Sequence, residues 1–373
     1  MQDSVILMPP SLDAYVPAAP PQRRIAVLMS GGVDSSMAAH LLRQSGLEVV
    51  GVTMKVPVSC EGPVAGCCGA DAAFVCRQLG IPHYFVDVTQ SFRRLVIERF
   101  RQDYAEGRTP NPCVDCNTRL KFSRVWDLIE RVFGVSRLAT GHYARVVDSP
   151  DGPRLARGAN RAKDQSYFLY GIAAARLSQL SLPLGDRTKD EVRSMARQIK
   201  LDVAEKSESM ELCFAGQGDY RMALSAEQAD RCGDLTDMAG NRIGEHRGIS
   251  NYTLGQRKGL GFAGGKPLYV GRIDPHRNTV ALGTRTEVSF ERITAGEPNI
   301  LIHSRYVAQA RVLGKVRSYG EPQPCIIETA GPDGFAVCFD SPCFAPCPGQ
   351  RLVLYNTQGQ IIAGGTILGA SHA

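Results

Sequence analysis

The sequence predicts an α/β fold: a doubly wound, mostly parallel sheet followed by two small, mainly-β domains, of which the last is a β-barrel. Over roughly the first 200 residues, strand-like apolar runs alternate with helix-like runs, the pattern of a parallel sheet with helices on both faces. After about residue 216, short β-like runs separated by Gly, Asn and Asp turns dominate, which is typical of small all-β domains. The chain of 373 residues is long enough for this division.

Each element of the α/β part is predicted by its own run of residues. Apolar runs predict strands at 25–29, 49–54, 82–88 and 135–140, and amphipathic runs predict helices at 37–44, 70–78, 91–104, 120–133 and 188–199. Thr188, followed three residues later by Glu191, forms a capping box that marks the start of the last helix. In the β part, alternating runs predict strands at 269–273, 279–282, 325–329, 335–339 and 351–355.

These runs predict four parts of the chain: a loose N-terminal extension, the α/β domain, a small central domain and a C-terminal β-barrel domain, at 1–22, 23–215, 216–290 and 291–373. No apolar run approaches the ~20 residues that span a bilayer, and the N-terminus lacks the pattern of a signal peptide. We therefore expect a cytoplasmic protein without membrane contact. The formal charge of +6 is compatible with an RNA partner. Twelve cysteines in such a chain indicate thiol chemistry or metal binding rather than a disulfide framework.

The most informative stretch is Ser30-Gly31-Gly32-Val33-Asp34-Ser35-Ser36, between a predicted strand and a predicted helix. Two adjacent glycines let the backbone approach a ligand and turn its N–H groups toward it. The start of the helix adds unpaired donors and the positive end of a dipole, which favour a phosphate, and the serines add hydroxyl donors. Asp34 beside phosphates makes sense mainly if a metal ion or another cation lies between them.

This stretch is not a Walker-type P-loop, because no Lys directly follows the glycines. It resembles the SGGxDS loop of the N-type ATP pyrophosphatases, which split ATP between the α and β phosphates and adenylate an oxygen of their substrate. Every fixed position of that pattern is matched in the right strand–helix context, which argues against a glycine-rich turn without a ligand.

Two cysteine-containing stretches form a second set of candidates. Residues 108–117 read Arg-Thr-Pro-Asn-Pro-Cys-Val-Asp-Cys-Asn, and we expect Asn117 to cap the helix that follows. That cap would place Cys116 near a helix N-terminus, where a thiolate is stabilised. Cys213 lies in the stretch 208–216, just before the sequence changes from alternating strand-like and helix-like runs to short β-like runs. It can meet Cys116 across one cleft.

Three further motifs complete the pattern: ATGHY at 139–143, KDQSYFL at 163–169 and YTLGQRKGLG at 252–261. Together with the loop and the two cysteine stretches, these motifs follow one another along the chain in the order found in the tRNA-specific 2-thiouridylases. The chain resembles that family over essentially all of residues 24–368. The resemblance implies an adenine nucleotide alpha hydrolase-like fold of the PP-loop superfamily. It makes 23–215 the ATP pyrophosphatase domain and 216–290 a tRNA-contacting domain.

The same resemblance implies thiolation of C2 of the wobble uridine in tRNA, with ATP and Mg²⁺ as cofactors. The C2 oxygen attacks the α-phosphate and pyrophosphate leaves, so that AMP becomes the leaving group. Cys213 carries a persulfide received from a sulfur-carrier protein or a cysteine desulfurase relay protein. Cys116 is the nucleophile that completes sulfur release and leaves a Cys116–Cys213 disulfide to be reduced. Asp34 is the third residue expected to be catalytic.

The remaining residues implied by the resemblance fall into two sets. The ATP site is expected to comprise the loop and two strand ends: Leu28, Met29, Ser30, Gly31, Gly32, Val33, Asp34, Ser35, Ser36, Met54 and Gly141. Contacts with tRNA are expected at Asn111, Pro112, Cys113, His142, Lys163, Asp164, Gln165, Arg317, Ser318 and Gln350. Arg257 and Lys258, in a Gly-rich loop of the central domain, are candidates for a contact with the phosphate backbone.

The chain departs from many members of this family at Cys113, where they have an Asp assigned to acid/base work. The change creates Cys-x-x-Cys, and Cys113, Cys116 and Cys213 would supply three thiolates to a [4Fe–4S] cluster with one open iron site. In that alternative the open iron holds the incoming sulfide and no protein persulfide forms. A structural zinc site that joins Cys113 and Cys116 to Cys67 and Cys68 lacks the usual ligand spacing. We slightly favour the persulfide route.

Two other functions stay open on the sequence alone. Another adenylating ATP pyrophosphatase, acting on a small substrate, would not need two separated reactive cysteines or trailing β domains. A nucleotide-binding regulator without turnover would need the loop but not Asp34, Cys116 or Cys213. A Cys213→Ser substitution separates these functions, because thiolation should vanish while ATP binding persists.

Overall fold

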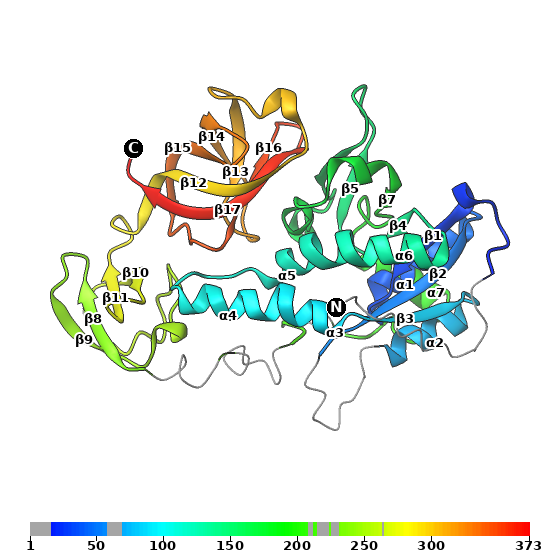
Figure 1. Ribbon diagram of the computed structural model, residues 1–373, viewed down its shortest axis with the longest axis horizontal. Helices are drawn as coiled ribbons and strands as arrows, with labels where there is room; N and C mark the ends of the chain where they lie inside the picture. Colours follow the sequence, from blue (N-terminus) through cyan, green and yellow to red (C-terminus); the bar gives the residue numbers. More distant parts are fainter. Residues whose placement is uncertain (1–15, 58–68, 208–211, 215–223, 225–230, 263–264) are drawn as a thin grey trace. The chain divides into compact units, whose positions relative to one another are not determined.

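The computed structural model describes residues 16–57, 69–207, 212–214, 224, 231–262 and 265–373 (Figure 1). Cys67 and Cys68, and most of the expected N-terminal extension, lie outside these residues. The chain forms two compact units. One consists of Met1–Leu95 with Val114–Gly216, and the other of Val96–Cys113 with Gln217–Ala373.

The first unit contains a five-stranded sheet in the order β3-β2-β1-β4-β7, with every neighbouring pair parallel. Its strands are β1 (Arg24–Leu28), β2 (Glu48–Lys55), β3 (His83–Asp87), β4 (Leu138–Ala139) and β7 (Leu180–Ser181). The strand predicted at 135–140 is reduced to two residues, because the chain turns away from the sheet directly after Ala139. The predicted parallel sheet is confirmed.

Helices cover both faces of this sheet. Side chains alternate along a strand, so Ile25 and Val27 of β1 point to one face. There they join an apolar cluster with the helices α1 (Val33–Gln44), α2 (Ala70–Gln78) and α7 (Lys189–Gln198). On the other face, Phe133 of α6 (Trp126–Phe133) packs against Tyr84 of β3, with ring centroids 4.9 Å apart. The doubly wound arrangement is therefore confirmed (Figure 1).

Two helical stretches begin earlier than predicted. The first runs through α3 (Thr89–Phe92), η2 (Arg93–Ile97) and α4 (Glu98–Ala105), and the second through α5 (Pro112–Asp115), η3 (Cys116–Val125) and α6; η2 and η3 are wound as π-helix. Proline suits the first position of a helix, where its missing N–H needs no partner. Asn117 thus lies inside the helix, and the predicted Asn117 cap is wrong. Its Nδ2 instead donates to the Phe168 carbonyl at 3.1 Å.

Short elements connect these layers. They are η1 (Pro21–Arg23), the hairpin of β5 (Ala144–Val147) and β6 (Arg154–Arg157), η4 (Arg161–Lys163), η5 (Ser166–Leu169) and η6 (Ala174–Gln179). The predicted capping box of α7 is confirmed: the Glu191 N–H donates to Thr188 Oγ1 at 3.2 Å, and the Thr188 N–H donates to Glu191 Oε2 at 2.7 Å.

The second unit holds two β structures. The first is a sheet in the order β10-β11-β8-β9, formed by β8 (Gly233–Asp237), β9 (Arg242–His246), β10 (Tyr269–Asp274) and β11 (Thr279–Gly283), with η9 (Ile249–Asn251) beside it. The second is a closed barrel in the order β12-β15-β14-β13-β16-β17. Its elements are β12 (Ser289–Ile300), η10 (His303–Arg305), β13 (Arg311–Lys315), β14 (Gln323–Ala330), β15 (Gly334–Phe344), β16 (Arg351–Tyr355) and β17 (Ile361–Ser371). The predicted β-barrel is confirmed.

Candidate active site

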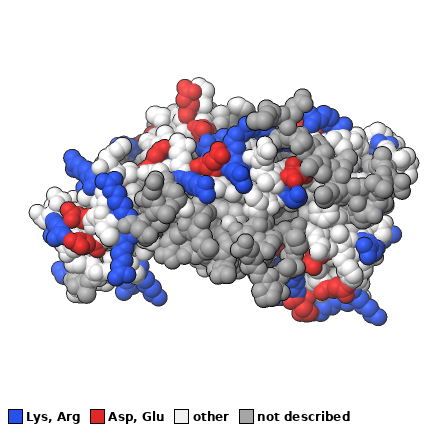
Figure 2. Space-filling model, turned by 60° about the horizontal axis from the view of Figure 1, so that its bottom comes forward, with Lys and Arg blue, Asp and Glu red and all other residues white. Residues whose placement is uncertain are grey.

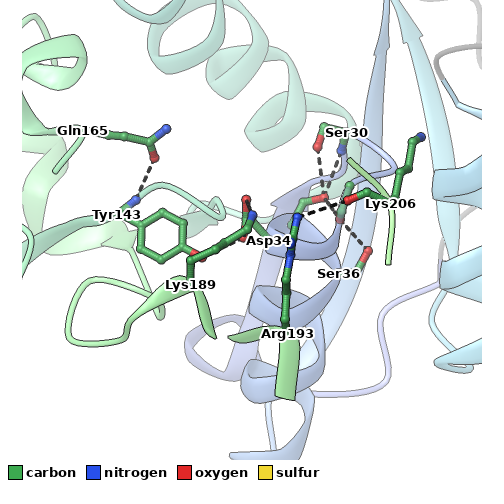
Figure 3. Close-up of polar contacts among 10 residues, drawn as sticks. Ser30, Asp34, Ser36, Tyr143, Gln165, Lys189, Arg193 and Lys206 are labelled. Carbon is green, nitrogen blue, oxygen red and sulfur yellow. Dashed lines mark hydrogen bonds and ion pairs between the residues drawn. The ribbon is translucent and has the colours of Figure 1, made fainter. Parts of the chain in front are cut away.

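The glycine-rich loop connects β1 to α1 at the carboxyl end of β1 (Figure 3). In this sheet the strand order changes direction between β1 and β4, and parallel sheets bind ligands at that switch point. The helix begins at Val33, earlier than predicted, so Asp34, Ser35 and Ser36 lie in its first turn. The Ser36 N–H donates to the Gly32 carbonyl at 3.3 Å, but the N–H groups that precede it at the helix start have no acceptor within the helix, which gives this loop the donors that a phosphate needs.

The shape of the loop is held by backbone conformation and serine hydroxyls. Gly31 has φ +72°, and a side chain there would come within 3.0 Å of Asp71 Cβ. The Ser35 and Ser36 hydroxyls donate to the Gly32 carbonyl at 3.2 and 2.8 Å. In this structure the two hydroxyls therefore brace the turn that leads into α1.

Gly141 packs directly against the first turn of α1. A Cβ at this position would lie 2.6 Å from Asp34 C, 2.6 Å from Ser35 N and 2.9 Å from the Asp34 carbonyl oxygen. Only glycine lets the segment after β4 approach the backbone of α1 so closely. Two motifs that the sequence predicted for one ATP site are thus in contact.

Asp34 is held by two side chains that the sequence analysis did not include in the site. Lys189 Nζ lies 2.8 and 2.7 Å from the two Asp34 carboxylate oxygens, and the Tyr143 hydroxyl donates to Oδ1 at 2.7 Å (Figure 3). The Lys189 ammonium also lies 5.9 Å from the centroid of the Tyr143 ring. Lys189 is the first residue of α7, so the capping box that fixes the start of this helix also positions its ammonium.

Two members of the KDQ motif organise the segment that carries Tyr143. Gln165 Oε1 accepts a hydrogen bond from the Tyr143 N–H at 2.8 Å, and the Gln165 N–H donates to the Tyr143 carbonyl at 2.9 Å. The Asp164 side chain is fully buried and forms an ion pair with Arg157 at 3.0 Å. It also accepts hydrogen bonds from the Gly158 and Ser166 N–H groups at 3.0 Å each. These contacts are structural, and the predicted tRNA contacts of Asp164 and Gln165 stay predictions.

A second ammonium approaches the loop from the other side. Lys206 Nζ donates to the Gly31 carbonyl at 3.3 Å and forms an ion pair with Asp71. The Arg193 guanidinium, on α7, reaches the Lys206 carbonyl at 3.5 Å (Figure 3). The segment that begins with α7 therefore brings two lysines to the glycine-rich loop.

The residues predicted to lie near adenosine are at the ends of the two central strands. Leu28 and Met54 are half-buried, and Met29 is buried. The Met29 N–H donates to the Val52 carbonyl at 2.8 Å, and its carbonyl accepts from Thr53 Oγ1 at 3.0 Å. These strand ends can provide an apolar surface for a base, while their backbone groups are already engaged.

The two candidate sulfur-transfer cysteines belong to the first unit and differ in exposure. Cys116 is buried and Cys213 is exposed. Phe214, next to Cys213, packs edge-on against Phe92 of α3 at 5.9 Å, and α3 also contacts η3, the segment that begins with Cys116. Both cysteines thus lie on segments that pack against α3, although the sequence places them far apart.

His142 directly follows Gly141 in the segment after β4. Its Nδ1 lies 2.7 Å from Thr140 Oγ1, and its ring packs at a tilt against Phe122 with centroids 6.0 Å apart. Burial, together with the Lys121 ammonium, lowers the pKa of His142 to about 3. The imidazole is therefore neutral at pH 7 and can act as a hydrogen-bonding group but not as a cation toward phosphates.

In the second unit, two predicted tRNA contacts from distant parts of the chain meet. Asn111 Nδ2 donates to Gln350 Oε1 at 3.3 Å, and Gln350 Nε2 donates to the carbonyls of Thr109 and Pro110 at 3.1 and 3.0 Å. Pro112 is buried, and Cys113, which follows it, is exposed. The barrel residue Gln350 therefore fixes the loop that precedes α5.

Arg317 has an unexpected set of partners. Its guanidinium donates to the carbonyls of Leu254 and Ala345 at 3.3 and 2.6 Å, and lies 5.8 Å from the Phe344 ring centroid. Arg317 and its neighbour Ser318 are half-buried. Arg317 thus joins the 252–261 loop to the barrel, which the sequence did not predict, and its contact with tRNA stays a prediction, as does that of Ser318.

Sequence reasoning missed Lys189, Lys206 and Tyr143 as parts of the site. Two of them lay beside recognised signals, since Lys189 follows the capping residue Thr188 and Tyr143 closes the ATGHY motif. No local pattern, however, indicates that the Lys189 ammonium returns to a carboxylate 155 residues away.

No three side chains of the kinds that bind metals are grouped to hold an ion anywhere in the described part of the chain. Within the same residues, no helix combines the length and the apolar character that a membrane crossing requires.

Three family models match the chain in succession. The first is described as tRNA methyl transferase HUP domain and matches residues 23–217, the second as tRNA methyl transferase PRC-barrel domain at 222–284, and the third as Aminomethyltransferase beta-barrel domain at 290–368. The first model alone covers more than half of the chain and includes the glycine-rich loop, Lys189 and both candidate cysteines.

Curated relatives match over almost the whole length. The tRNA-specific 2-thiouridylase MnmA of Carboxydothermus hydrogenoformans is 42% identical over 365 residues, which are 93% of this chain and 98% of the relative. The protein of the same name from Methylorubrum extorquens is 40% identical over 383 residues, 97% of this chain and 98% of the relative. The family resemblance predicted from the motifs is confirmed, and the chain belongs to the tRNA-specific 2-thiouridylase family.

Proposed function

We propose that this protein uses ATP to replace the C2 oxygen of the wobble uridine of tRNA by sulfur. The observation that carries the proposal is that the first unit holds both halves of the chemistry. A nucleotide loop opens α1 at the switch point of the sheet, and Cys116 and Cys213 lie on segments that pack against α3. A regulator that only binds a nucleotide would not need the two cysteines.

In the activation step, the first turn of α1 binds the phosphates of ATP through its N–H groups. The strand ends at Met29 and Met54 receive the adenine, and Gly141 permits the close approach that completes the site. The uridine C2 oxygen attacks the α-phosphorus, a new O–P bond forms, and the bond to pyrophosphate breaks with its electron pair on the leaving group. The products are an adenylated uridine and pyrophosphate.

In the sulfur-transfer step, the terminal sulfur of a Cys213 persulfide attacks C2, and the C2–O bond breaks as AMP leaves. The Cys116 thiolate then attacks the Cys213 sulfur. The S–S bond to the transferred sulfur breaks, its electrons remain with 2-thiouridine, and a Cys116–Cys213 disulfide forms. A thiol reductant restores both cysteines. Exposure of Cys213 suits delivery of sulfur by a carrier protein or a desulfurase relay protein, and burial of Cys116 suits a resolving role.

For tRNA, we assign 216–290 as the central contacting domain and 291–373 as the barrel domain, after the ATP pyrophosphatase domain at 23–215. Residues 246–273 contain five Lys or Arg and no Asp or Glu: Arg247, Arg257, Lys258, Lys266 and Arg272. All five are exposed, and basic side chains are more prominent than acidic ones on the face in Figure 2. Such a segment suits the phosphate backbone, which positions RNA without reading its sequence.

The implied metals fit the described residues to different degrees. Because no described group of three side chains is placed to hold a metal ion, Mg²⁺ would rest mainly on the phosphate oxygens of ATP, as it commonly does. The alternative [4Fe–4S] cluster would need Cys113, Cys116 and Cys213 as its ligands. Since two cysteines are enough for the persulfide route, we keep that route as the proposal, and the test below separates the two.

The test is mass spectrometry of nucleosides from unmodified tRNA incubated with the protein, ATP, Mg²⁺ and a persulfide donor. Iron-free, aerobically purified protein is expected to form 2-thiouridine. Cys213→Ser and Cys116→Ser are expected to abolish the product while ATP binding persists. Cys232→Ser is the matched control, because Cys232 is also exposed and has no proposed role.

Three other outcomes of this assay would contradict the proposed mechanism or the proposed substrate. Product formed only after anaerobic reconstitution of a cluster would replace the persulfide route by the iron–sulfur route. Normal product from Cys213→Ser would contradict the sulfur-transfer step proposed above. Absence of product under both conditions would favour an adenylating enzyme with another substrate.

A further inference from the structure

Cys113 is a cysteine that the proposed sulfur-transfer step does not use. It stands where many members of the family have an Asp, and together with Cys116 it forms a Cys-x-x-Cys motif. The proposed step needs only Cys116 and Cys213, and it ends with a disulfide between them. Cys113 is therefore a third thiol next to one end of the disulfide that each turnover leaves behind.

The two cysteines of the motif lie on one helical stretch. The helix begins at Pro112, so Cys113 is its second residue and Cys116 its fifth, in the continuous run of α5 and η3. Side chains three residues apart on a helix share one side, with Cβ atoms about 5–6 Å apart, and the later side chain leans toward the preceding turn. A disulfide needs Cβ atoms about 3.5–4.5 Å apart, so a small adjustment of the first turn lets the two sulfurs bond.

The two thiols differ in their access to solvent. Cys113 is exposed, whereas Cys116 is buried, with an exposed fraction of 7%. A reductant from solution can therefore reach the Cys113 sulfur but not the Cys116 sulfur. A disulfide between the two would be reduced from its Cys113 end, and exposed or strained disulfides are the ones that are easily reduced.

The Cys116–Cys213 disulfide offers a thiol from solution only the exposed Cys213 sulfur. Attack at that sulfur would leave the reductant bound to Cys213, the residue that has to accept the next sulfur atom. Attack on the Cys116 sulfur from within the chain avoids this mixed disulfide. A thiol held one helical turn away acts at a high effective concentration, because it need not be brought in from solution.

We infer that Cys113 regenerates Cys213 by disulfide exchange. The Cys113 thiolate attacks the Cys116 sulfur, a Cys113–Cys116 bond forms, and the Cys116–Cys213 bond breaks with its electron pair on Cys213. Cys213 is then a thiolate that can receive the next sulfur, and the proton that Cys113 gave up has passed to solvent. Two equivalents of a thiol reductant, which become oxidised to their own disulfide, return Cys113 and Cys116 to thiols. This inference rests on the proposed function, since the Cys116–Cys213 disulfide is what Cys113 attacks.

The first test follows the disulfide through one turnover of the full, iron-free chain. Cys213 is loaded with persulfide, excess donor is removed, and ATP, Mg²⁺ and unmodified tRNA are added without reductant. N-Ethylmaleimide then traps free thiols before digestion with trypsin. Cys113 and Cys116 share the tryptic peptide 109–119, and Cys213 lies in the peptide 207–221. Mass spectrometry therefore distinguishes a bridge within the first peptide from a bridge between the two.

For each 2-thiouridine formed, wild type is expected to carry a bridge within 109–119 and an alkylated Cys213. Cys113→Ser and Cys113→Asp are expected to carry the bridge between 109–119 and 207–221 instead, because no third thiol can exchange with it. Cys232→Ser is the matched control, since this cysteine is also exposed, and its bridge should lie where that of wild type does.

The second test compares rates with a thiol reductant present. The rate over many turnovers is divided by the rate of a single turnover, so that a change in tRNA binding, which affects both, cancels. In Cys113→Ser this ratio should fall about 5- to 10-fold, because attack from solution replaces attack within the helix. In Cys232→Ser the ratio should equal that of wild type.

Three results would overturn the inference. One is a wild-type bridge that stays between 109–119 and 207–221, and another is an unchanged ratio of rates in Cys113→Ser. The third is iron held by Cys113, Cys116 and Cys213, with all three cysteines reduced throughout turnover.

Failure of the inference and failure of the proposed function give different results. If 2-thiouridine forms but the bridge stays at Cys213, the exchange is wrong and the proposed function stands. If no 2-thiouridine forms under any condition, the proposed function fails, and the exchange fails with it. Titration of tRNA-free protein with mixtures of reduced and oxidised dithiothreitol then shows whether Cys113 and Cys116 still form a bridge within 109–119.

Discussion

Replacing Gly141 by Ala is expected to disturb the glycine-rich loop, because the added methyl group would clash with the first turn of α1. The added Cβ would lie 2.6 Å from two backbone atoms, Asp34 C and Ser35 N. Carbon atoms in contact prefer about 3.5–4.0 Å, so the two segments would have to separate by about 1 Å. Neither neighbour is a flexible side chain that can move aside, because both atoms belong to the first turn of α1.

The cost follows from overpacking. Inserting a methyl group into a well-packed site costs about 1–3 kcal/mol of folding free energy. Because the added methyl group meets backbone atoms of Asp34 and Ser35, we expect a cost near the top of this range. A loss of about 3 kcal/mol lowers the Tm of a domain of roughly 200 residues by about 6–12 °C. ATP affinity should fall as well, because the displaced atoms carry the N–H groups of the proposed phosphate site.

Scanning calorimetry with and without ATP measures both effects on the transition of the α/β domain. Gly369→Ala is the matched control, since a Cβ there would meet only Thr294 Oγ1, at 3.7 Å. Its Tm should stay within about 1–2 °C of wild type, as expected for a cost of a few tenths of a kcal/mol. A Gly141→Ala protein with the same Tm and ATP affinity as wild type would refute the close approach of the two motifs.

Three further predictions concern stability. Asp164→Ala should cost about 3–5 kcal/mol in urea unfolding, because it leaves the buried Arg157 without its carboxylate, whereas Asp151→Ala, at an exposed pair, should cost less than about 1 kcal/mol; equal costs would contradict the buried pair. Burial lowers the pKa of His83 to about 4. The unfolded chain therefore binds this proton more readily, and stability should fall by up to about 3 kcal/mol as pH drops from about 6.5 to 4; in His83→Gln that part of the pH dependence should disappear. Arg317→Met should lower the Tm of the barrel transition even without tRNA, since the Leu254 and Ala345 carbonyls lose a charged donor and keep only the weak Cys347 thiol donor at 3.5 and 3.2 Å; an unchanged Tm with weakened tRNA binding would instead leave Arg317 a tRNA contact alone.

The fold and the nucleotide loop were predictable because their signals are local. Four of the five strands of the parallel sheet are marked by a short apolar run, and the loop is marked by seven consecutive residues, whereas the two-residue strand β7 was not predicted. The start of the helix at Pro112 was not predictable in the same way. The prolines and cysteines around it favoured a loop that Asn117 would end, whereas the structure begins the helix at the second proline of that stretch.

The partners of Asp34 could not be predicted, because they come from tertiary structure. Tyr143 and Lys189 reach the carboxylate from segments 109 and 155 residues away. Likewise, burial and an ion pair with Arg157 decide the role of Asp164, and neither can be predicted from the residues of the KDQ motif. Sequence motifs thus located the site but did not reveal which side chains act through others.

The contacts of Gln165 lead to a last prediction, which joins the two substrates. Gln165 makes two hydrogen bonds to the backbone of Tyr143, and Tyr143 in turn donates to the Asp34 carboxylate, which pairs with Lys189. If Gln165 served tRNA alone, Gln165→Ala would leave ATP binding unchanged in the absence of tRNA. Because it holds the segment that carries Tyr143, we expect ATP affinity to fall about 3- to 10-fold without any tRNA present, as the loss of a partly buried hydrogen bond implies. Calorimetric titration of ATP into the tRNA-free variant distinguishes the two cases. A residue that the sequence marks for RNA contact would then also prepare the nucleotide site, so that the two substrates depend on one segment of backbone.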